Sequence, residues 1–297
     1  MRVLEGGNPN GHPVFVLHGT PGSRLLYQKH VEDATRRGLR LIGYDRPGYG
    51  GSTPMRGRRV VDAAHDVLAI AEDLGLDRFA VWGHSGGGHH ALACAAVLRD
   101  RVVAATSLAA DAPYTAVTAE GLDWFQGMSD WHTQFFKAMM SNPAALDELS
   151  APDILTRDQF RERVSSILSD VDRLALTDEL VDYVMASERE GQRAGLAGGR
   201  DDSLAEIAPW GFDLATIRVP LQVWHGKHDK FVPFPQGEWL AAHLPEADIH
   251  LESEEGHVSL FERRIPDVHE WLESHFLKEI ARAGGRSYPL GPGFEPR

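Results

Sequence analysis

Short apolar segments alternate with amphipathic ones along much of the chain, and this alternation restricts the fold more than any other feature. Each apolar run has the length of a strand, and the segment after it usually has its apolar residues at helical spacing. The apolar runs lie at residues 13–17, 39–43, 78–82, 102–108, 219–224 and 248–251. Strands that are apolar on both faces belong to sheets covered by helices on both sides. The pattern therefore predicts an α/β fold with a mostly parallel central sheet flanked by helices.

The alternation stops at Asp111 and resumes only near residue 212, and between these points the apolar spacing is helical. We therefore expect residues 1–111 and 212–283 to form one core domain. Residues 112–211 are expected to form a helical cap, or lid, inserted into that core. The tail at residues 284–297 is rich in Gly and Pro and is expected to be irregular.

Three local patterns stand out within this insertion. Thr156 and Gln159 have the spacing of a capping box, which predicts a helix start. Residues 177–193 have the spacing of a further helix, and residues 198–202, Gly-Gly-Arg-Asp-Asp, are expected to form a loose link after it. Five large apolar residues recur at intervals of three or four, which predicts one apolar helical stripe. They are Trp124, Met128, Trp131, Phe135 and Met139.

One apolar run leads directly into a serine that has glycines close to it on both sides. The segment reads Gly83-His84-Ser85-Gly86-Gly87, and a helix rich in Ala and Leu follows. A serine exposed for attack sits in a strained turn from strand to helix, where glycine neighbours permit a close backbone approach. The helix start also directs amide groups at the point where negative charge would develop. Ser85 is therefore the candidate nucleophile.

Charge and cysteine content limit the class of protein. The formal net charge of −13 over 297 residues argues against nucleic acid or an anionic membrane surface as partner. Cys94 is the only cysteine, so an internal disulfide is excluded, and we expect its thiol to be buried. We see no signal peptide and no apolar run long enough to span a membrane. The expectation is a cytoplasmic protein that acts on a small molecule, of undetermined oligomeric state.

A serine needs a base and an orienting acid to become a nucleophile. Asp229 lies just after the apolar run 219–224, and His257 follows the next run with a glycine before it. Because the carboxyl ends of parallel strands meet at one edge of a sheet, we expect Ser85, Asp229 and His257 to lie close together. Asp111, at the end of the strand before the insertion, is the alternative acid.

Five motifs, in this order along the chain, resemble those of the α/β-hydrolase fold superfamily. They are His18-Gly19-Thr20-Pro21-Gly22, the Asp45–Ser52 loop, the Ser85 turn, His225-Gly226-Lys227-His228-Asp229 and Gly256-His257. The resemblance covers residues 1–111 and 212–283, and it implies an esterase-like serine hydrolase with a helical cap after the sixth strand of that family's sheet. It implies Ser85 as nucleophile, His257 as general base and then acid, and Asp229 as the orienting acid. The implied oxyanion hole consists of the backbone N–H groups of Thr20 and Gly86.

The resemblance also places the cap over the nucleophile, so substrate choice is expected to reside there. The candidate pocket residues are His84, Trp124, Met128, Trp131 and Phe135. For the aromatic stripe, we favour packing of the cap against the sheet over pocket lining, and different residues can do each. No cofactor and no metal are expected, because the histidines near Ser85 fit no zinc motif. His18, Asp45 and Arg46 are expected to hold their loops in place.

The function implied is cofactor-independent hydrolysis of a carboxylic ester, lactone or similar small acyl substrate through an acyl-enzyme on Ser85. One alternative is an aminopeptidase, because the loop at residues 18–22 resembles that of proline iminopeptidases. That branch has G-G-S-W-G around its serine, unlike this chain, and needs an amine-binding carboxylate, for which Glu120, Glu188 and Glu190 are guesses. A C–C hydrolase, a lyase or a cofactorless oxygenase on the same triad are further alternatives. A non-catalytic scaffold would predict a broken triad, whereas all three residue types are present.

Overall fold

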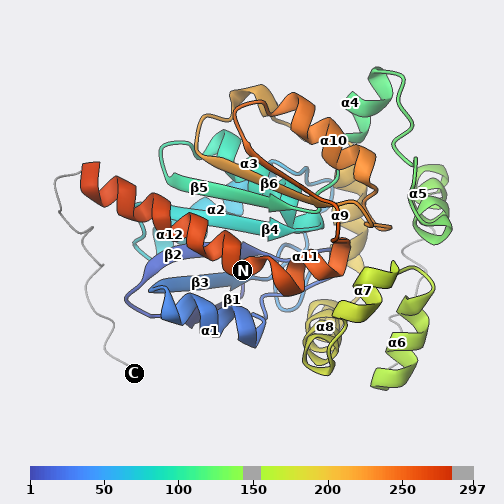
Figure 1. Ribbon diagram of the computed structural model, residues 1–297, viewed down its shortest axis with the longest axis horizontal. Coiled ribbons are helices and arrows are strands. Elements are labelled where there is room, and N and C mark those ends of the chain that lie inside the picture. Colours follow the sequence, from blue (N-terminus) through green and yellow to red (C-terminus); the bar gives the residue numbers. More distant parts are fainter. Residues whose placement is uncertain (143–154, 283–297) are drawn as a thin grey trace.

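A seven-stranded sheet forms the centre of the computed structural model, which describes residues 1–142 and 155–282 (Figure 1). The strand order is β1-β3-β2-β4-β5-β6-β7; β1 pairs antiparallel with β3, and all other pairs are parallel. The strands are β1 (Val3–Gly7), β2 (His12–Leu17), β3 (Leu39–Tyr44), β4 (Phe79–His84), β5 (Val102–Leu108), β6 (Leu221–Gly226) and β7 (Asp248–Glu252). The predicted α/β class and mostly parallel sheet are confirmed. The tail predicted at residues 284–297 lies outside the described residues.

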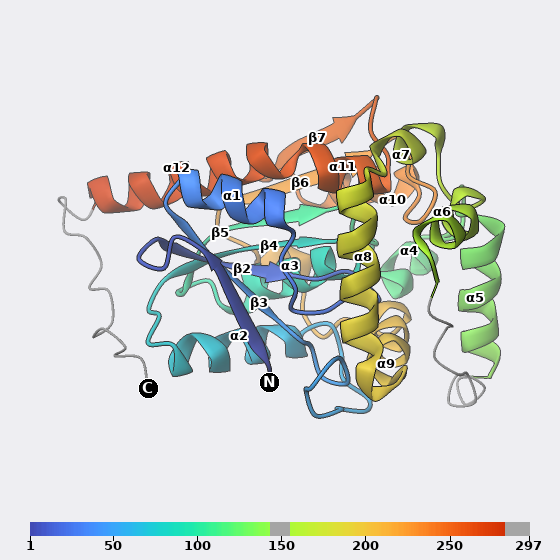
Figure 2. The ribbon, with the colours of Figure 1, turned by 90° about the horizontal axis from the view of Figure 1, so that it is seen from below.

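Helices cover both faces of the sheet (Figure 2). One face carries α1 (Gln28–Arg36), α11 (His257–Arg263) and α12 (Ile265–Arg282), and the other carries α2 (Asp62–Asp73), α3 (Gly86–Val97) and α10 (Phe234–His243). Strand β4 shows why the sequence specifies this arrangement. Phe79 and Val81 pack in the cluster that contains α2 and α3, whereas Ala80 and Trp82 pack in the cluster that contains α12. Both faces of the strand are thus buried, as its continuous apolar run predicts.

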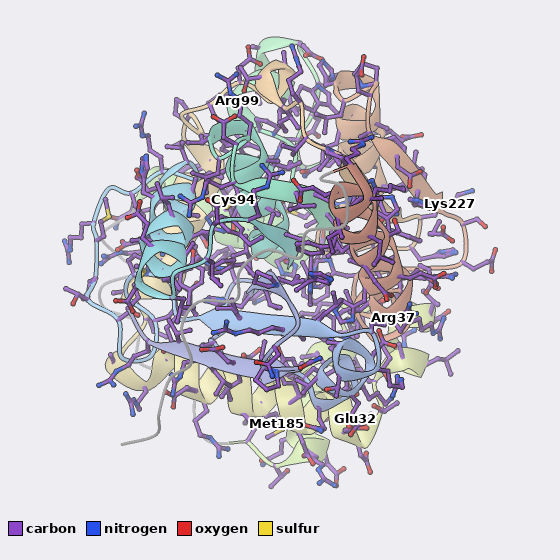
Figure 3. All side chains as sticks on the ribbon, turned by 90° about the vertical axis from the view of Figure 1, so that its left-hand side faces the viewer. Glu32, Arg37, Cys94, Arg99, Met185 and Lys227 are labelled. Atoms are coloured by element: carbon purple, nitrogen blue, oxygen red, sulfur yellow. The ribbon has the colours of Figure 1, made fainter. Side chains whose placement is uncertain are left out.

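Helix α3 also carries the single cysteine (Figure 3). Cys94 is fully buried, as expected, among the apolar side chains that pack between α3 and the sheet. Burial raises the pKa of its thiol, so the group is a packing residue rather than a thiolate. No helix in residues 1–142 and 155–282 combines the length and the apolar character that a bilayer crossing requires.

The described part of the segment between β5 and β6 contains helices joined by turns and no strand, and it lies beyond the carboxyl ends of the parallel strands (Figures 1 and 2). Its helices are α4 (Tyr114–Ala119), α5 (Asp130–Ser141), α6 (Arg157–Ser165), α7 (Asp170–Ala175), α8 (Asp178–Gly191), η2 (Gln192–Ala194), α9 (Ala197–Ile207) and η3 (Leu214–Thr216). The predicted capping box is present at the start of α6. Thr156 Oγ1 accepts from the Gln159 N–H at 3.3 Å, and Gln159 Oε1 accepts from the Thr156 N–H at 2.9 Å.

The prediction of a loose link at residues 198–202 is wrong, because these residues belong to α9. Gly198 packs so closely on Tyr49 that a Cβ atom would lie 2.6 Å from its ring. The Asp202 side chain is fully buried. Glycine and aspartate are poor helix formers, so the composition predicted a loop, but here the glycine permits contact with the core and the aspartate is paired there.

The prediction of one helical stripe is also wrong. Helix α5 begins only at Asp130, after Ser129 accepts a hydrogen bond from the His132 N–H as the N-cap. Gly127 has a φ of +88°, which ends the preceding turn. Trp124 and Met128 therefore precede the helix on which Trp131, Phe135 and Met139 lie.

Candidate active site

Ser85 occupies the turn between β4 and α3. Its φ of 56° and ψ of −129° lie in a region of backbone conformation that residues other than glycine rarely adopt. The Ser85 N–H donates to the Leu108 carbonyl at 2.9 Å, which anchors the turn to β5. A Cβ atom on Gly87 would lie 1.9 Å from the Leu17 carbonyl oxygen, so only glycine lets α3 approach β2 this closely. The partly exposed Ser85 side chain thus sits in the strained turn that the sequence predicts.

Asp229 and His257 form a hydrogen-bonded pair at the carboxyl edge of the sheet. Asp229 lies in the turn after β6, and His257 is the first residue of α11. The His257 Nδ1 and Asp229 Oδ2 atoms are 2.7 Å apart. The other carboxylate oxygen, Oδ1, accepts from the N–H groups of Phe231 and Val232, each at 2.8 Å. We place the proton of this hydrogen bond on His257 Nδ1, because a carboxylate oxygen accepts hydrogen bonds. The other ring nitrogen, Nε2, is then free to accept a proton.

Burial controls the charge of both members of this pair. It lowers the pKa of His257 to about 4, against the opposing effect of the Asp172 carboxylate. The imidazole is therefore neutral at pH 7, as a general base must be. Burial raises the pKa of Asp229, and the hydrogen bonds from Val232 and Phe231 oppose that rise. Asp111, the alternative acid, lies instead beside His89, with 3.8 Å between Asp111 Oδ2 and His89 Nδ1.

His84 connects the serine turn to the histidine. Its Nε2 atom donates to the His257 carbonyl oxygen at 2.9 Å, and the two imidazole rings are 4.5 Å apart. Burial, followed by the charge of His257, lowers the pKa of His84 to about 3, so the ring is neutral. The chain neighbour of Ser85 is thus bonded to the backbone of the candidate base.

Thr20 and Gly86, whose amides are expected to form the oxyanion hole, lie close to each other. A Cβ atom on Gly86 would be 2.3 Å from Thr20 Oγ1. Among the described residues 1–142 and 155–282, no carbonyl accepts a hydrogen bond from the N–H group of Thr20 or Gly86. The oxyanion hole made of these two groups stays a prediction.

A buried carboxylate from α9 holds the loop that carries Thr20. Asp202 Oδ2 accepts from Thr20 Oγ1 at 3.1 Å, from Arg46 Nη2 at 2.6 Å and from the Tyr49 hydroxyl at 2.7 Å. Its Oδ1 atom is paired with Arg58. Burial raises the pKa of Asp202, but Arg46 and Arg58 overcome this and hold it well below its ordinary value. Arg46 fixes its loop, as expected, whereas Asp202 was missed because it stands in an apparent link.

A second buried carboxylate, from α7, binds the start of the helix that carries His257. Asp172 Oδ1 accepts from the N–H groups of Val258 and Ser259 at 2.8 and 2.9 Å. Asp172 Oδ2 accepts from the His257 N–H at 3.1 Å. A Cβ atom on Gly256 would lie 2.4 Å from Asp172 Oδ2, which explains the glycine before His257. In the sequence Asp172 resembles any acidic residue in the first turn of a helix, so no signal identified it.

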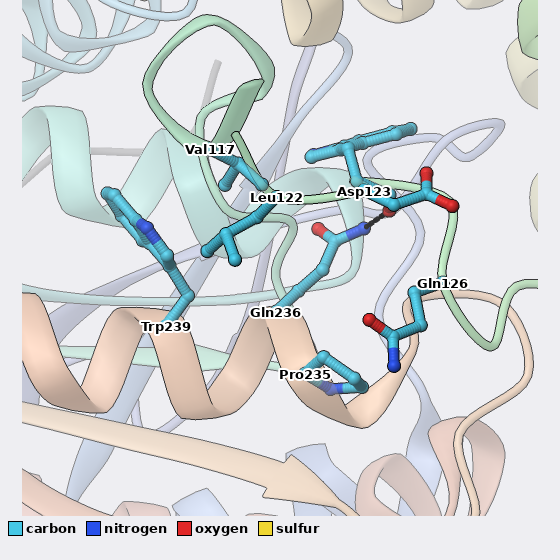
Figure 4. A pocket seen from close by; sticks show the side chains of 8 residues that line it. Val117, Leu122, Asp123, Gln126, Pro235, Gln236 and Trp239 are labelled. Carbon is cyan, nitrogen blue, oxygen red and sulfur yellow. Dashed lines mark hydrogen bonds between the residues drawn. The ribbon is translucent and has the colours of Figure 1, made fainter. Parts of the chain in front are cut away.

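The candidate pocket residues of the insertion have different surroundings. Trp124 is buried, donates to the Ala112 carbonyl at 2.8 Å and lines a cavity of about 60 Å³ with Gln236 and Trp239 (Figure 4). Ser85, Asp229 and His257 do not line this cavity. Met128 is buried in the same core cluster as Trp124. Both side chains thus pack in the core, which is the role that we favoured for the aromatic stripe.

Trp131 and Phe135 stack on each other at 5.5 Å, and Trp131 is 57% exposed. Helix α5 approaches the candidate site through a residue that we did not predict. The His132 ring lies 4.5 Å from the Phe231 ring, which in turn stacks on His257 at 4.8 Å.

The three glutamates considered for binding an amine are engaged elsewhere. Glu120 accepts from Trp239 Nε1 at 2.9 Å. Glu190 pairs with Arg24 at 2.7 Å, and Glu188 lies 3.6 Å from Arg163. The described residues contain one group with the spacing of metal ligands, which comprises His89, Asp111 and Glu206.

Comparisons with known proteins agree with this fold. The family model described as the alpha/beta hydrolase fold matches residues 12–264. A relative from Pseudomonas putida, 2-hydroxy-6-oxononadienedioate/2-hydroxy-6-oxononatrienedioate hydrolase 2, is 27% identical over 85% of this chain and 84% of its own length. A thermophilic esterase from Thermogutta terrifontis has a TM-score of 0.65 at 20% identity and covers 92% of this chain and 93% of its own. A bromoperoxidase from Bacillus anthracis has a TM-score of 0.67 at 21% identity, with 93% and 94% covered. These two structures show similarity of fold.

Proposed function

Because this chain belongs to the alpha/beta hydrolase fold family and is a hydrolase, we propose that it cleaves a carboxylic ester, lactone or similar small acyl substrate through an acyl-enzyme on Ser85. The observation that carries this proposal is the 2.7 Å hydrogen bond between Asp229 and His257. The bond lies at the carboxyl edge of the sheet, where Ser85 occupies the turn after β4. The bond fixes the tautomer that leaves His257 Nε2 unprotonated.

In the proposed first half-reaction, Ser85 Oγ attacks the acyl carbon while His257 Nε2 takes the hydroxyl proton. The carbonyl oxygen becomes an oxyanion and accepts hydrogen bonds from the N–H groups of Thr20 and Gly86. When the tetrahedral intermediate collapses, the bond to the leaving group breaks and His257 donates its proton to the departing oxygen. Asp229 stabilises the imidazolium form in between.

In the second half-reaction, water replaces the alcohol. His257 removes a proton from the water as it attacks the acyl-enzyme, and the same two amides bind the new oxyanion. Collapse of this intermediate breaks the bond to Ser85 Oγ, which regains a proton from His257. The products are a carboxylic acid and an enzyme in its starting state.

We further propose that the insertion at residues 112–211 acts as a cap that selects the substrate. The support is its position beyond the carboxyl ends of the strands and the contact of His132, through Phe231, with His257. A substrate that enters toward Ser85 from that side would pass these aromatic rings.

Labelling with a fluorophosphonate tests the nucleophile directly. We expect the wild-type chain to become covalently labelled and Ser85→Ala to remain unlabelled, with Ser253→Ala, a substitution at an exposed serine, labelled as the wild type is. Hydrolysis of p-nitrophenyl butyrate should follow the same order. A folded wild-type protein that neither reacts with the probe nor cleaves the ester would refute the proposal.

A second candidate is cleavage of a C–C bond by the same triad, which is favoured by the name of the Pseudomonas putida relative. A dioate substrate carries two negative charges. Asp111 and Glu206, which lie near the serine turn, offer such a substrate no positive charge to pair with. For this reason we place ester hydrolysis first. Turnover of 2-hydroxy-6-oxononadienedioate with a higher kcat/KM than any aryl ester would reverse the order.

A further inference from the structure

Three side chains from distant parts of the chain converge beside the serine turn. His89 comes from α3, Asp111 follows β5, and Glu206 comes from α9. One potential ligand atom from each lies within 4.8 Å of the other two. Because 22 and 95 residues separate them along the chain (111 − 89 and 206 − 111), no spacing motif could have indicated the group.

The histidine of this group lacks the hydrogen bonds that buried polar atoms normally have. His89 is 0% exposed, and neither of its ring nitrogens has a hydrogen-bond partner among the described residues. The side chains of Asp111 and Glu206 are buried beside it. Polar groups buried without partners are costly, so a shared ligand would offset a substantial penalty.

The charge around the group favours a cation. Arg46 and Arg58, the nearby buried basic residues, are already paired with Asp202. The nearby positive charge is therefore committed to Asp202. A cation between Asp111 and Glu206 would supply the opposite charge to these two buried carboxyl groups.

We propose that His89, Asp111 and Glu206 bind a divalent transition-metal ion such as Zn²⁺. An imidazole nitrogen with two carboxylate oxygens suits Zn²⁺, whereas Mg²⁺ and Ca²⁺ prefer oxygen ligands alone. Ligands about 2.1 Å from a common zinc ion lie roughly 3–4 Å from each other, and the His89 Nδ1 to Asp111 Oδ2 distance is 3.8 Å.

The proposed site adjoins the oxyanion hole. Glu206 Oε1 lies 3.3 Å from the position of a Cβ atom on Gly86, the residue whose N–H is one of the two candidate donors. A cation held there places positive charge close to the candidate nucleophile's turn. It is also paired with the two carboxylates that hold it.

Zinc binding by the full chain tests the proposal without reference to activity. After treatment with a chelator and dialysis, we expect calorimetric titration with ZnCl₂ to show one saturable site, and we expect Zn²⁺ to raise the melting temperature. His89→Ala and the near-isosteric Glu206→Gln should each weaken binding by more than about 10-fold, a loss seen even for outer-shell partners. His65→Ala, which changes an exposed histidine of α2, is the matched control and should bind as the wild type does.

Ser85→Ala should bind Zn²⁺ with unchanged affinity, so failure of the proposed hydrolysis and failure of the metal site are distinguishable. Circular dichroism checks that each variant is folded. If His89→Ala does not fold, Glu206→Gln still tests the site. Absence of a stoichiometric site in the folded wild type would overturn the proposal. So would binding that is unchanged in folded Glu206→Gln.

Discussion

Replacement of Asp172 by alanine should destabilise the start of the helix that carries His257. The Asp172 side chain is fully buried, and its oxygens accept from the N–H groups of three consecutive residues, His257, Val258 and Ser259. These are among the N–H groups that a helix start leaves without intrahelical partners. Removal of the carboxylate leaves these N–H groups without that acceptor at a buried position.

The contacts set the size of the effect. Loss of an N-cap side chain costs about 0.5–2 kcal/mol, and a hydrogen bond to a charged group contributes about 1.5–3 kcal/mol. The cost of burying the carboxylate offsets part of this. We therefore expect Asp172→Ala to lose about 2–4 kcal/mol, which for a chain of 297 residues corresponds to a fall in melting temperature of roughly 3–6 °C. Asp172→Asn keeps an acceptor oxygen and should lose less.

The same change should alter the pH dependence of catalysis. The negative charge of Asp172 raises the pKa of His257, while burial lowers it. His257 must be neutral to act as a base, so kcat/KM rises with pH through its pKa. Removal of the charge in Asp172→Asn lowers that pKa further and should shift the acid limb of the profile to lower pH.

Differential scanning fluorimetry and pH–rate profiles with p-nitrophenyl butyrate measure both effects. Asp170→Asn is the matched control, because its side chain is 90% exposed on the same helix, and it should change neither quantity. An unchanged melting temperature in Asp172→Ala, or an acid limb that moves to higher pH in Asp172→Asn, would refute this account of the α7 contact.

Two further substitutions test the buried carboxylates of the site. Asp202→Ala leaves Arg46 and Arg58 buried without their partner. We expect urea denaturation to show that the free energy of unfolding falls by about 3–5 kcal/mol. A fall below about 1 kcal/mol, which is typical of a surface ion pair, would contradict this. In Asp229→Asn the side-chain oxygen should stay on the N–H groups of Phe231 and Val232. The NH2 group then faces His257 Nδ1 and favours the wrong tautomer, so kcat for ester hydrolysis should fall by about 10⁴-fold while the protein stays folded. A kcat that stays close to the wild-type value would show that another group orients the imidazole.

The sheet and its three strand-end loops could be predicted because their signals are local. Continuous apolar runs identify strands buried on both faces, and the glycines beside Ser85 and His257 mark close backbone approaches. Each of these signals lies within a few residues of the position that it describes. For this reason the strands and the pairing of Asp229 with His257 agree with expectation.

The insertion could not be predicted in the same way, because its informative residues act across long distances in the chain. Asp172, Asp202 and Glu206 lie in helices where acidic residues normally face solvent, and no local pattern reveals that they are buried. Gly127 and Ser129 interrupt the apparent stripe, since a turn and an N-cap there override apolar spacing that continues through them.

Each loop of the candidate site contacts a different helix, or helix start, of the insertion. The Ser129 N–H at the start of α5 donates to the Lys230 carbonyl, in the loop of the candidate acid, at 3.0 Å. On α7, Asp172 binds the start of the candidate base's helix, and on α9, Asp202 binds Thr20 of the oxyanion loop. The candidate reacting groups lie in the loops of the core, and these contacts hold each loop from the other side. We therefore expect a displacement of one helix to perturb one loop selectively, so that a substrate that repacks the insertion would change the geometry of the proposed triad without touching it.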